Sequence, residues 1–104
     1  MKLSNKDLNN MACMDLFDRA MSDYAQCEHA CDVSRLRSCT AWVYDTDNFY
    51  LLRSYGTFIG AIEKSTGYGA DALRHEYGYT ATSAQHLAKF FSDYGNRQKV
   101  YRYY

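Results

Sequence analysis

The stretch that most constrains the fold is residues 78–95, which carry a start signal, an apolar face and a stop signal for one helix. Thr82, followed three residues later by Gln85, forms a capping box and predicts where the helix begins. Residues at i, i+3, i+4 and i+7 form its apolar face: Leu87, Phe90, Phe91 and Tyr94. Gly95 then supplies a residue that tolerates the left-handed conformation after the last turn. We expect this helix to cover a sheet built by the preceding residues.

Three runs rich in aromatic and β-branched residues predict that sheet. They are residues 40–44, 49–55 and 57–63, and turns at residues 45–48 and at Gly56 separate them. In the third run, alternation places Phe58, Gly60 and Ile62 on one face and Ile59 and Ala61 on the other. Residues 68–75 are a weaker segment, consistent with a fourth strand or with a loop that contains a helical turn. Short turns between successive strands indicate an antiparallel meander.

The N-terminal third predicts a helix. Ser4 is its N-cap and Asp7 its acidic third residue. One apolar stripe of about five turns follows. The stripe consists of Leu8, Ala12, Leu16, Ala20 and Tyr24, with Cys13, Phe17 and Met21 beside them. Cys27, Ala30 and Cys31 can extend it to about residue 31, or the helix breaks near Gln26 and restarts. The polar residues 32–38 are expected to be a connection.

These elements predict an α+β fold: an N-terminal helix or helix pair, a three- to four-stranded antiparallel meander, and a C-terminal helix packed on the sheet. A chain of 104 residues is expected to form a single domain. Its parts are a helical region (1–38), the sheet with the capped helix (39–95), and a basic and aromatic tail (96–104). The polar N-terminus and the lack of a long apolar run predict a cytoplasmic protein with free thiols and no membrane partner.

The charge balance excludes two classes of protein. Twelve basic residues match twelve acidic ones, which argues against an acidic DNA mimic and against a generally basic nucleic-acid binder. Acidic residues are in excess in residues 1–52 and basic residues in residues 53–104. The eleven tyrosines suit both the half-buried faces of a small sheet and a binding surface.

The most metal-like cluster is Cys27 and Cys31, four residues apart and therefore on one side of a helix. Cys13, Cys39 or His86 could complete a zinc site with them. Structural zinc sites, however, use two short Cys/His pairs from turns, and this chain has one pair at helical spacing. We therefore expect no metal, and interpret these cysteines as small buried hydrophobic residues.

Catalytic signatures are also weak. A cysteine nucleophile paired with His75 or His86 is conceivable, but no nucleophile-elbow motif accompanies it. Gly67-Tyr-Gly69 lacks the lysine and the helix that a phosphate-binding loop needs. We expect a protein that is not an enzyme and has no cofactor.

Leu52-Arg-Ser-Tyr-Gly-Thr-Phe-Ile-Gly-Ala-Ile62, a Gly67 turn and Gly78-Tyr-Thr-Ala-Thr-Ser-Ala-Gln-His-Leu87 resemble a small uncharacterised domain. That domain is common in phages and mobile elements of Gram-positive gut bacteria. The resemblance covers residues 52–91 and leaves out the N-terminal third. It implies a phage setting and the strand–strand–helix order, but no catalytic residue. Free-standing proteins of this size in that setting are often inhibitors of host defence, such as anti-CRISPR proteins, which is an analogy of setting.

Two polar groups remain as candidate binding sites. The first lies at the start of the C-terminal helix: Tyr79, Thr80, Thr82, Ser83 and His86. It could attract a phosphate or a partner's carboxylate, or the hydroxyls cap the helix while His86 hydrogen-bonds back to the sheet. The second is the tail: Arg97, Lys99, Tyr101, Arg102, Tyr103 and Tyr104. It could stack on single-stranded nucleic acid, anchor a protein partner, or form an edge strand or disordered end.

The leading hypothesis is a non-enzymatic protein that binds a host protein or nucleoprotein stoichiometrically and blocks it, as an anti-CRISPR-type inhibitor does. The tail tyrosines and arginines are expected to supply the contacts. The alternative is a small accessory factor that binds nucleic acid through the basic C-terminal half. A homodimer is a further option, because the N-terminal apolar stripe can exceed what the sheet covers.

Overall fold

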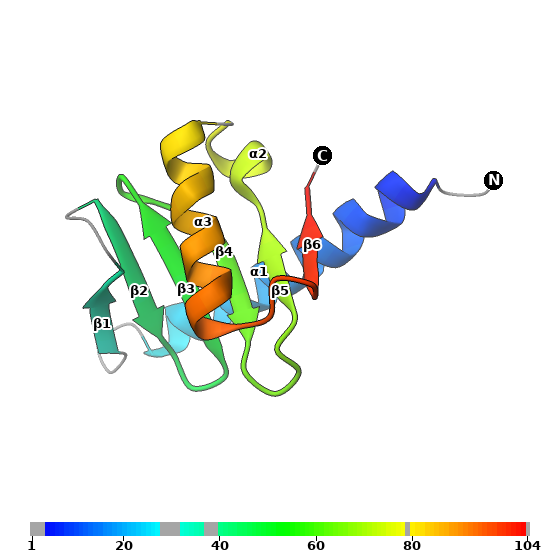
Figure 1. Ribbon diagram of the computed structural model, residues 1–104. Helices are drawn as coiled ribbons and strands as arrows, with labels where there is room; N and C mark the ends of the chain where they lie inside the picture. The colour runs from blue at the N-terminus through cyan, green and yellow to red at the C-terminus, as the bar shows by residue number, and fades with distance from the viewer. Residues whose placement is uncertain (1–3, 28–31, 37–39, 79, 104) are drawn as a thin grey trace.

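The computed structural model describes residues 4–27, 32–36, 40–78 and 80–103. The elements are α1 (Asn5–Cys27), β1 (Asp32–Arg35), β2 (Ala41–Asp45), β3 (Phe49–Ser54), β4 (Thr57–Glu63), β5 (Gly69–Asp71), α2 (Leu73–Glu76), α3 (Ala81–Tyr94) and β6 (Val100–Arg102). Within these residues, six strands form one sheet in the order β1-β2-β3-β4-β5-β6. Neighbouring strands are antiparallel except for β5 and β6, which are parallel. Helix α1 lies behind the sheet and α3 lies in front of it (Figure 1).

The predicted α+β arrangement of helix, sheet and helix is confirmed, but the strand count and the purely antiparallel pairing were wrong. Residues 32–38 were expected to be a connection, and the structure places β1 there. Val33 is the only apolar residue of β1, so no alternation marks the strand. The tail forms β6 because the chain leaves β5, crosses one face through α2 and α3, and returns beside β5, which makes the two strands parallel. The weak segment at residues 68–75 holds both β5 and α2.

Helix α3 packs on a core made mostly of side chains from β2, β3 and β4. The buried residues of this core are Ala41, Val43, Leu52, Ile59, Ile62, Leu73, Leu87, Phe90 and Phe91. Two glycines let the helix approach the strands. A Cβ at Gly60 would lie 2.6 Å from Leu87 Cδ2, and one at Gly69 would lie 2.6 Å from Phe91 Cε1. The apolar face predicted for this helix is therefore correct, and glycines beneath it set the close packing.

Helix α1 covers the opposite face through the middle of its predicted stripe. Its buried residues are Cys13, Leu16, Phe17 and Ala20, which pack against Phe49, Leu51, Ala61, Ala70 and Ala72. The predicted cap is confirmed: Ser4 Oγ accepts from the Asp7 N–H at 3.1 Å, and Asp7 Oδ2 accepts from the Ser4 N–H at 3.3 Å. Leu8, expected to be in the stripe, is 52% exposed. The cause is that the first turns of α1 project past β6, where none of the described strands lies beneath them (Figure 1).

A β-bulge in the β3–β4 pair overturns part of the predicted alternation. Leu52 pairs with Gly60 and Arg53 pairs with Phe58, so Ile59 is the extra residue. Phe58 therefore lies on the α1 side, where its ring contacts Tyr24 at a centroid distance of 4.9 Å. Ile59 joins Ile62 on the α3 side instead of opposing it. One inserted residue reverses the alternation along the rest of the strand.

The ends of α3 also differ from the prediction. The N-cap is Thr80 rather than Thr82, because Thr80 is extended and its Oγ1 accepts from the Ser83 N–H at 3.2 Å. Thr82 is exposed inside the first turn, so the Thr82–Gln85 capping box does not form. Gly95 ends the helix with φ at −143°, outside the left-handed region. The glycine is needed there because a Cβ would lie 2.9 Å from Ile62 Cδ1.

Candidate functional site

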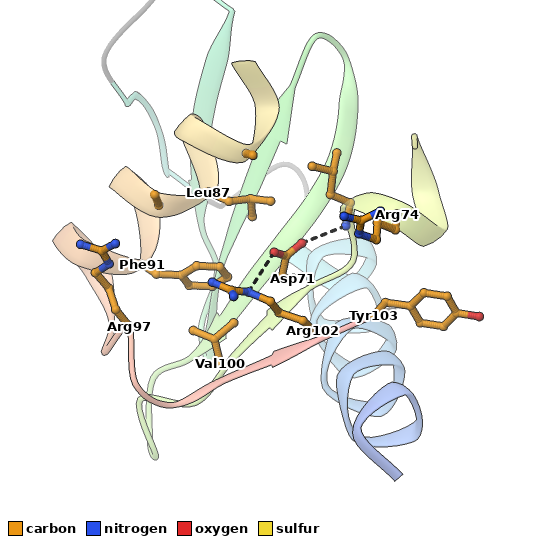
Figure 2. A pocket seen from close by; sticks show the side chains of 11 residues that line it. Asp71, Arg74, Leu87, Phe91, Arg97, Val100, Arg102 and Tyr103 are labelled. Carbon is orange, nitrogen blue, oxygen red and sulfur yellow. Dashed lines mark hydrogen bonds and ion pairs between the residues drawn. The ribbon is translucent and has the colours of Figure 1, made fainter. Parts of the chain in front are cut away.

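The best-formed hollow on the described surface is a groove between α3, the β5–α2 corner and β6 (Figure 2). Its volume is about 320 Å³. Leu87, Phe91 and Val100 form an apolar floor, and Arg74, Arg97 and Arg102 surround it. We call this site the arginine groove. Such a site combines an apolar contact area with a few charged groups that fix orientation, which is typical of binding sites.

The groove exists because small residues face it. Four α3 residues line the groove: Leu87 and Phe91 pack down onto the strands as its floor, whereas Ala84 and Ala88 are too small to fill the space above them. Gly69 in β5 lies directly beneath the Phe91 ring. Because Gly69 has no side chain, the ring packs close to the strand and the floor of the groove is deeper. The floor of the hollow is therefore built into the sequences of α3 and β5.

The three arginines come from three separate segments. Arg74 lies on α2, Arg97 lies in the turn between α3 and β6, and Arg102 lies on β6. All three are exposed. Each guanidinium offers five donors in a planar fork that matches a carboxylate or phosphate. The folded chain thus brings together cations that lie up to 28 positions apart in the sequence, from Arg74 to Arg102.

Asp71, at the end of β5, is the single acidic residue among the described residues that line the groove. Its Oδ1 accepts from the Leu73 N–H at 3.2 Å, and its Oδ2 lies 3.6 Å from Arg102 Nε (Figure 2). The side chain is 21% exposed. Burial raises the pKa of Asp71, and this effect outweighs the Leu73 N–H and the two nearby arginines, Arg102 and Arg74. Asp71 is a carboxylate held inside a cationic groove at a desolvation cost.

The predicted tail residues are divided between two faces. Arg97 and Arg102 line the groove, whereas Tyr101 packs towards α1 and stacks on Tyr68 with ring centroids 5.4 Å apart. Tyr103 borders the groove and also packs its ring edge to face with His75, at a centroid distance of 4.8 Å.

Two more members of the tail set lie away from the groove or outside the described residues. Lys99 does not line the groove, and its Nζ lies 5.3 Å from the centre of the Tyr68 ring. Tyr104 lies outside the described residues. The groove therefore contains the two arginines of the predicted set, together with Tyr103.

Two members of the helix-start group, Ser83 and His86, are buried. Ser54 Oγ on β3 lies 3.0 Å from His86 Nδ1 and 3.1 Å from Ser83 Oγ. Burial lowers the pKa of His86, so the neutral ring is favoured. Thr80 caps the helix, Thr82 is exposed, and Tyr79 lies outside the described residues. Ser83 and His86 thus connect α3 to Ser54 in the sheet. This agrees with the second interpretation of the group, in which a hydroxyl caps the helix and His86 hydrogen-bonds back to the sheet.

The cysteines do not form a cluster in the described chain. Cys13 and Cys27 are 14 residues apart on α1, roughly 21 Å along its axis. Burial, followed by the charge of Asp71, raises the pKa of Cys13 to about 12. Cys27 Sγ donates to the Asp23 carbonyl at 3.1 Å. Cys31 and Cys39 lie outside the described residues, and the described ones hold no group of three or more ligands that could bind a metal.

A second, shallower hollow lies on the α1 side of the sheet near β1. Val33, Trp42, Tyr44, Arg53 and Gly56 line it. Arg53 Nη1 donates to Tyr44 Oη at 3.0 Å. The guanidinium of Arg35 lies 4.9 Å from the centre of the Trp42 ring. We call this the Trp42 surface, and it presents aromatic and cationic groups together.

Sequence reasoning missed Asp71, Arg74 and the whole Trp42 surface. Asp71 and Arg74 fall in the weak segment at residues 68–75, and no motif marked them. The basic, aromatic tail indicated Arg97 and Arg102, and the signal that could have pointed to Arg74 was the excess of basic residues in residues 53–104.

No helix in the described residues is long and apolar enough to cross a membrane. Comparisons of the chain with protein-family models, curated proteins and solved structures gave no match.

Proposed function

We propose that this protein acts by stoichiometric binding rather than by catalysis, and that the arginine groove is its binding surface. The observation that carries the proposal is the placement of Arg74, Arg97 and Arg102, from three segments, around an apolar floor. Arginines beside an apolar centre are typical of surfaces that anchor a protein partner. Among the cysteines that the sequence suggested as nucleophiles, Cys13 is unsuited to catalysis because it is buried and its pKa is raised to about 12.

The partner in this proposal is a host protein or nucleoprotein in the host cytoplasm. The resemblance of residues 52–91 to a phage and mobile-element domain supports that setting. Binding there would block the partner by occlusion, as expected of an inhibitor of host defence of the anti-CRISPR type. The groove cations Arg97 and Arg102 belong to the tail that the sequence analysis had singled out for partner contact.

The test is recovery of a partner by the purified chain from a lysate of a Gram-positive gut bacterium, followed by mass spectrometry. The complex should then show a fixed stoichiometry in size-exclusion chromatography with light scattering. The double variant Arg97→Gln/Arg102→Gln should lose the partner. A control that loses two cations outside the groove, Lys6→Gln/Lys89→Gln, should retain it. Recovery of this chain alone would overturn the proposal and would point to a homodimer, for which exposed Leu8 and Met11 on α1 offer an apolar contact.

The second candidate function is a small nucleic-acid-binding accessory factor, and the Trp42 surface favours it. An aromatic side chain beside arginines is the arrangement on which bases of a single strand stack. Trp42 is the only tryptophan of the chain, so its fluorescence reports binding at that surface directly. Quenching by a single-stranded oligonucleotide, with an affinity that falls steeply as salt rises, would favour this function over the first.

A further inference from the structure

We propose that the arginine groove binds an acidic peptide segment of the partner, and that Asp71 occupies the groove as an internal substitute for the peptide's carboxylate. The bound segment would place a glutamate or aspartate against Arg97 and Arg102 and an adjacent apolar side chain on the floor. This inference rests on the proposed function and adds the chemical class of the ligand and a residue that limits its affinity.

The geometry around Arg102 is the first support. Arg102 Nε faces Asp71 Oδ2 at 3.6 Å, which is longer than a charge-assisted hydrogen bond. The Arg102 side chain is 60% exposed, so more than half of it remains open to a ligand. A carboxylate is therefore already paired with this arginine, but loosely. An external carboxylate that accepts from two N–H groups along one edge of the guanidinium, at shorter distances, can displace the pairing.

The second support is Arg97. Its side chain is exposed at the groove, and no hydrogen bond or ion pair within the described part of the chain holds it. Figure 2 shows Arg97 on the far side of Phe91 from Asp71. A ligand that contacts both Arg97 and Arg102 therefore lies across the apolar floor. That placement suits a ligand with an acidic group and an apolar group side by side.

The low exposure of the apolar floor favours a peptide over a nucleic acid as the ligand. Leu87 is 2% exposed and Phe91 is 3% exposed, so neither offers a free face for base stacking. Small apolar side chains can still rest on the floor between Ala84, Ala88 and Val100. Planar guanidiniums match carboxylates in two-point pairs, which peptide glutamates and aspartates supply.

The probe for the test is a fluorescein-labelled heptapeptide of alternating glutamate and leucine, titrated by fluorescence anisotropy. A peptide with glutamine in place of glutamate should not bind. Arg102→Gln and Arg97→Gln should each weaken binding about tenfold, as expected for the loss of a charged hydrogen-bond partner. Lys89→Gln removes an exposed cation from α3 outside the groove and should leave affinity within twofold.

Asp71→Asn is the variant that separates this inference from plain charge attraction. Its amide oxygen keeps the acceptor for the Leu73 N–H, so α2 should remain in place. Removing the carboxylate releases Arg102, and the variant should bind the peptide several-fold more tightly than the native chain. Unchanged or weaker binding by Asp71→Asn, with an unaltered circular-dichroism spectrum, would overturn the role of Asp71. Equal losses for Lys89→Gln and Arg102→Gln would overturn the groove as the site.

Competition by small anions tests the ligand class. Acetate should displace the peptide at least as well as inorganic phosphate at equal ionic strength, whereas stronger displacement by phosphate would overturn the carboxylate assignment. The inference and the proposed function fail separately. If a partner is recovered from lysate with fixed stoichiometry but the groove variants bind peptide like the native chain, only the inference is wrong. If the peptide binds as predicted and no partner is recovered, the stoichiometric function is wrong.

Discussion

Asp71 and Arg102 are register partners on the parallel strands β5 and β6, and their side chains meet on the α3 side of the sheet, with Asp71 Oδ2 3.6 Å from Arg102 Nε. The same carboxylate accepts from the Leu73 N–H at the start of α2. The backbone carbonyl of Asp71 accepts from the Tyr103 N–H at 2.9 Å. Asp71 thus connects β5, α2 and the C-terminal strand, which are the segments that surround the groove.

Asp71→Asn should stabilise the protein at neutral pH. Burial raises the pKa of Asp71, so the folded state binds this proton more tightly than the unfolded state. The stability that the protonated form contributes is present below the ordinary pKa of 3.8 and is lost as pH rises through the raised value. The Asp71→Asn variant avoids that loss, so its Tm at pH 7 should be a few degrees higher. This corresponds to about 1 kcal/mol in the free energy of unfolding. Thermal unfolding at pH 7 and pH 3 should show the gain only at pH 7, and a gain at both would contradict the account.

His86 should make stability fall under mild acid. Burial lowers its pKa, so the unfolded chain takes up the proton first as pH drops through the ordinary value of 6.5. Urea unfolding should give a lower free energy of unfolding at pH 5.5 than at pH 7.5. His86→Gln should flatten this dependence. The same slope in native protein and His86→Gln would assign the dependence to another group.

Gly60→Ala should destabilise the packing of α3 on β4. The new Cβ would lie 2.6 Å from Leu87 Cδ2 and 3.2 Å from the Ala70 carbonyl oxygen, and the backbone contact cannot yield as a side chain can. We expect a loss of about 2 kcal/mol in the free energy of unfolding, measured by urea denaturation. Ser65→Ala, in the exposed turn after β4, is the control and should change it by less than about 0.5 kcal/mol. Equal stability of the two variants would show that α3 does not pack this closely.

Asp23 should be the most important acidic residue of α1 for stability. Burial raises its pKa, but hydrogen bonds from Thr46 and Asn48 outweigh that effect and the pKa is lowered. Its carboxylate accepts from Thr46 Oγ1 at 2.6 Å and from the Asn48 N–H at 3.1 Å, joining the end of α1 to the β2–β3 turn.

Asp23→Ala should therefore cost about 2 kcal/mol at neutral pH. Asp15→Ala, which loses an exposed pair with Arg19, should cost less than about 0.5 kcal/mol, and chemical denaturation compares the two variants. If both substitutions lower the free energy of unfolding by the same amount, the hydrogen bonds from Asp23 to the β2–β3 turn are not formed. The cost of Asp23→Ala should also shrink as pH falls below the ordinary pKa of 3.8, because a lowered pKa contributes stability only above that value.

The sequence predicted the elements whose signal is local. The Ser4–Asp7 cap, the apolar face of α3 and the strand at residues 57–63 follow from spacing within a few turns or one strand. It failed where distant segments decide the structure. β6 is a strand because β5 offers it an edge, and the bulge at Ile59 depends on its pairing with β3. The N-cap of α3 is Thr80 instead of the predicted Thr82. Inside the helix that begins there, Ser83 and His86 contact Ser54 of the sheet.

The groove was harder to predict than the fold. Arg97 and Arg102 stood out because they sit in a basic, aromatic tail. Nothing local indicated that β6 would turn Arg102 towards Asp71 and direct Tyr101 to the α1 side. That division follows from strand alternation once the tail is known to be a strand. Arg74 joins them only because α2 follows β5 at the same edge of the groove.

The measurement that tests the central claim most directly is an NMR titration of the labelled protein with the glutamate–leucine heptapeptide, observing the arginine side-chain Nε–H signals. The account predicts that the signals of Arg97 and Arg102 shift and saturate together, along with the backbone amides of Asp71 and Leu73, while the indole N–H of Trp42 stays unchanged. Saturable shifts confined to Trp42, Arg35 and Arg53, with the groove arginines unmoved, would contradict it and place binding on the opposite face of the sheet.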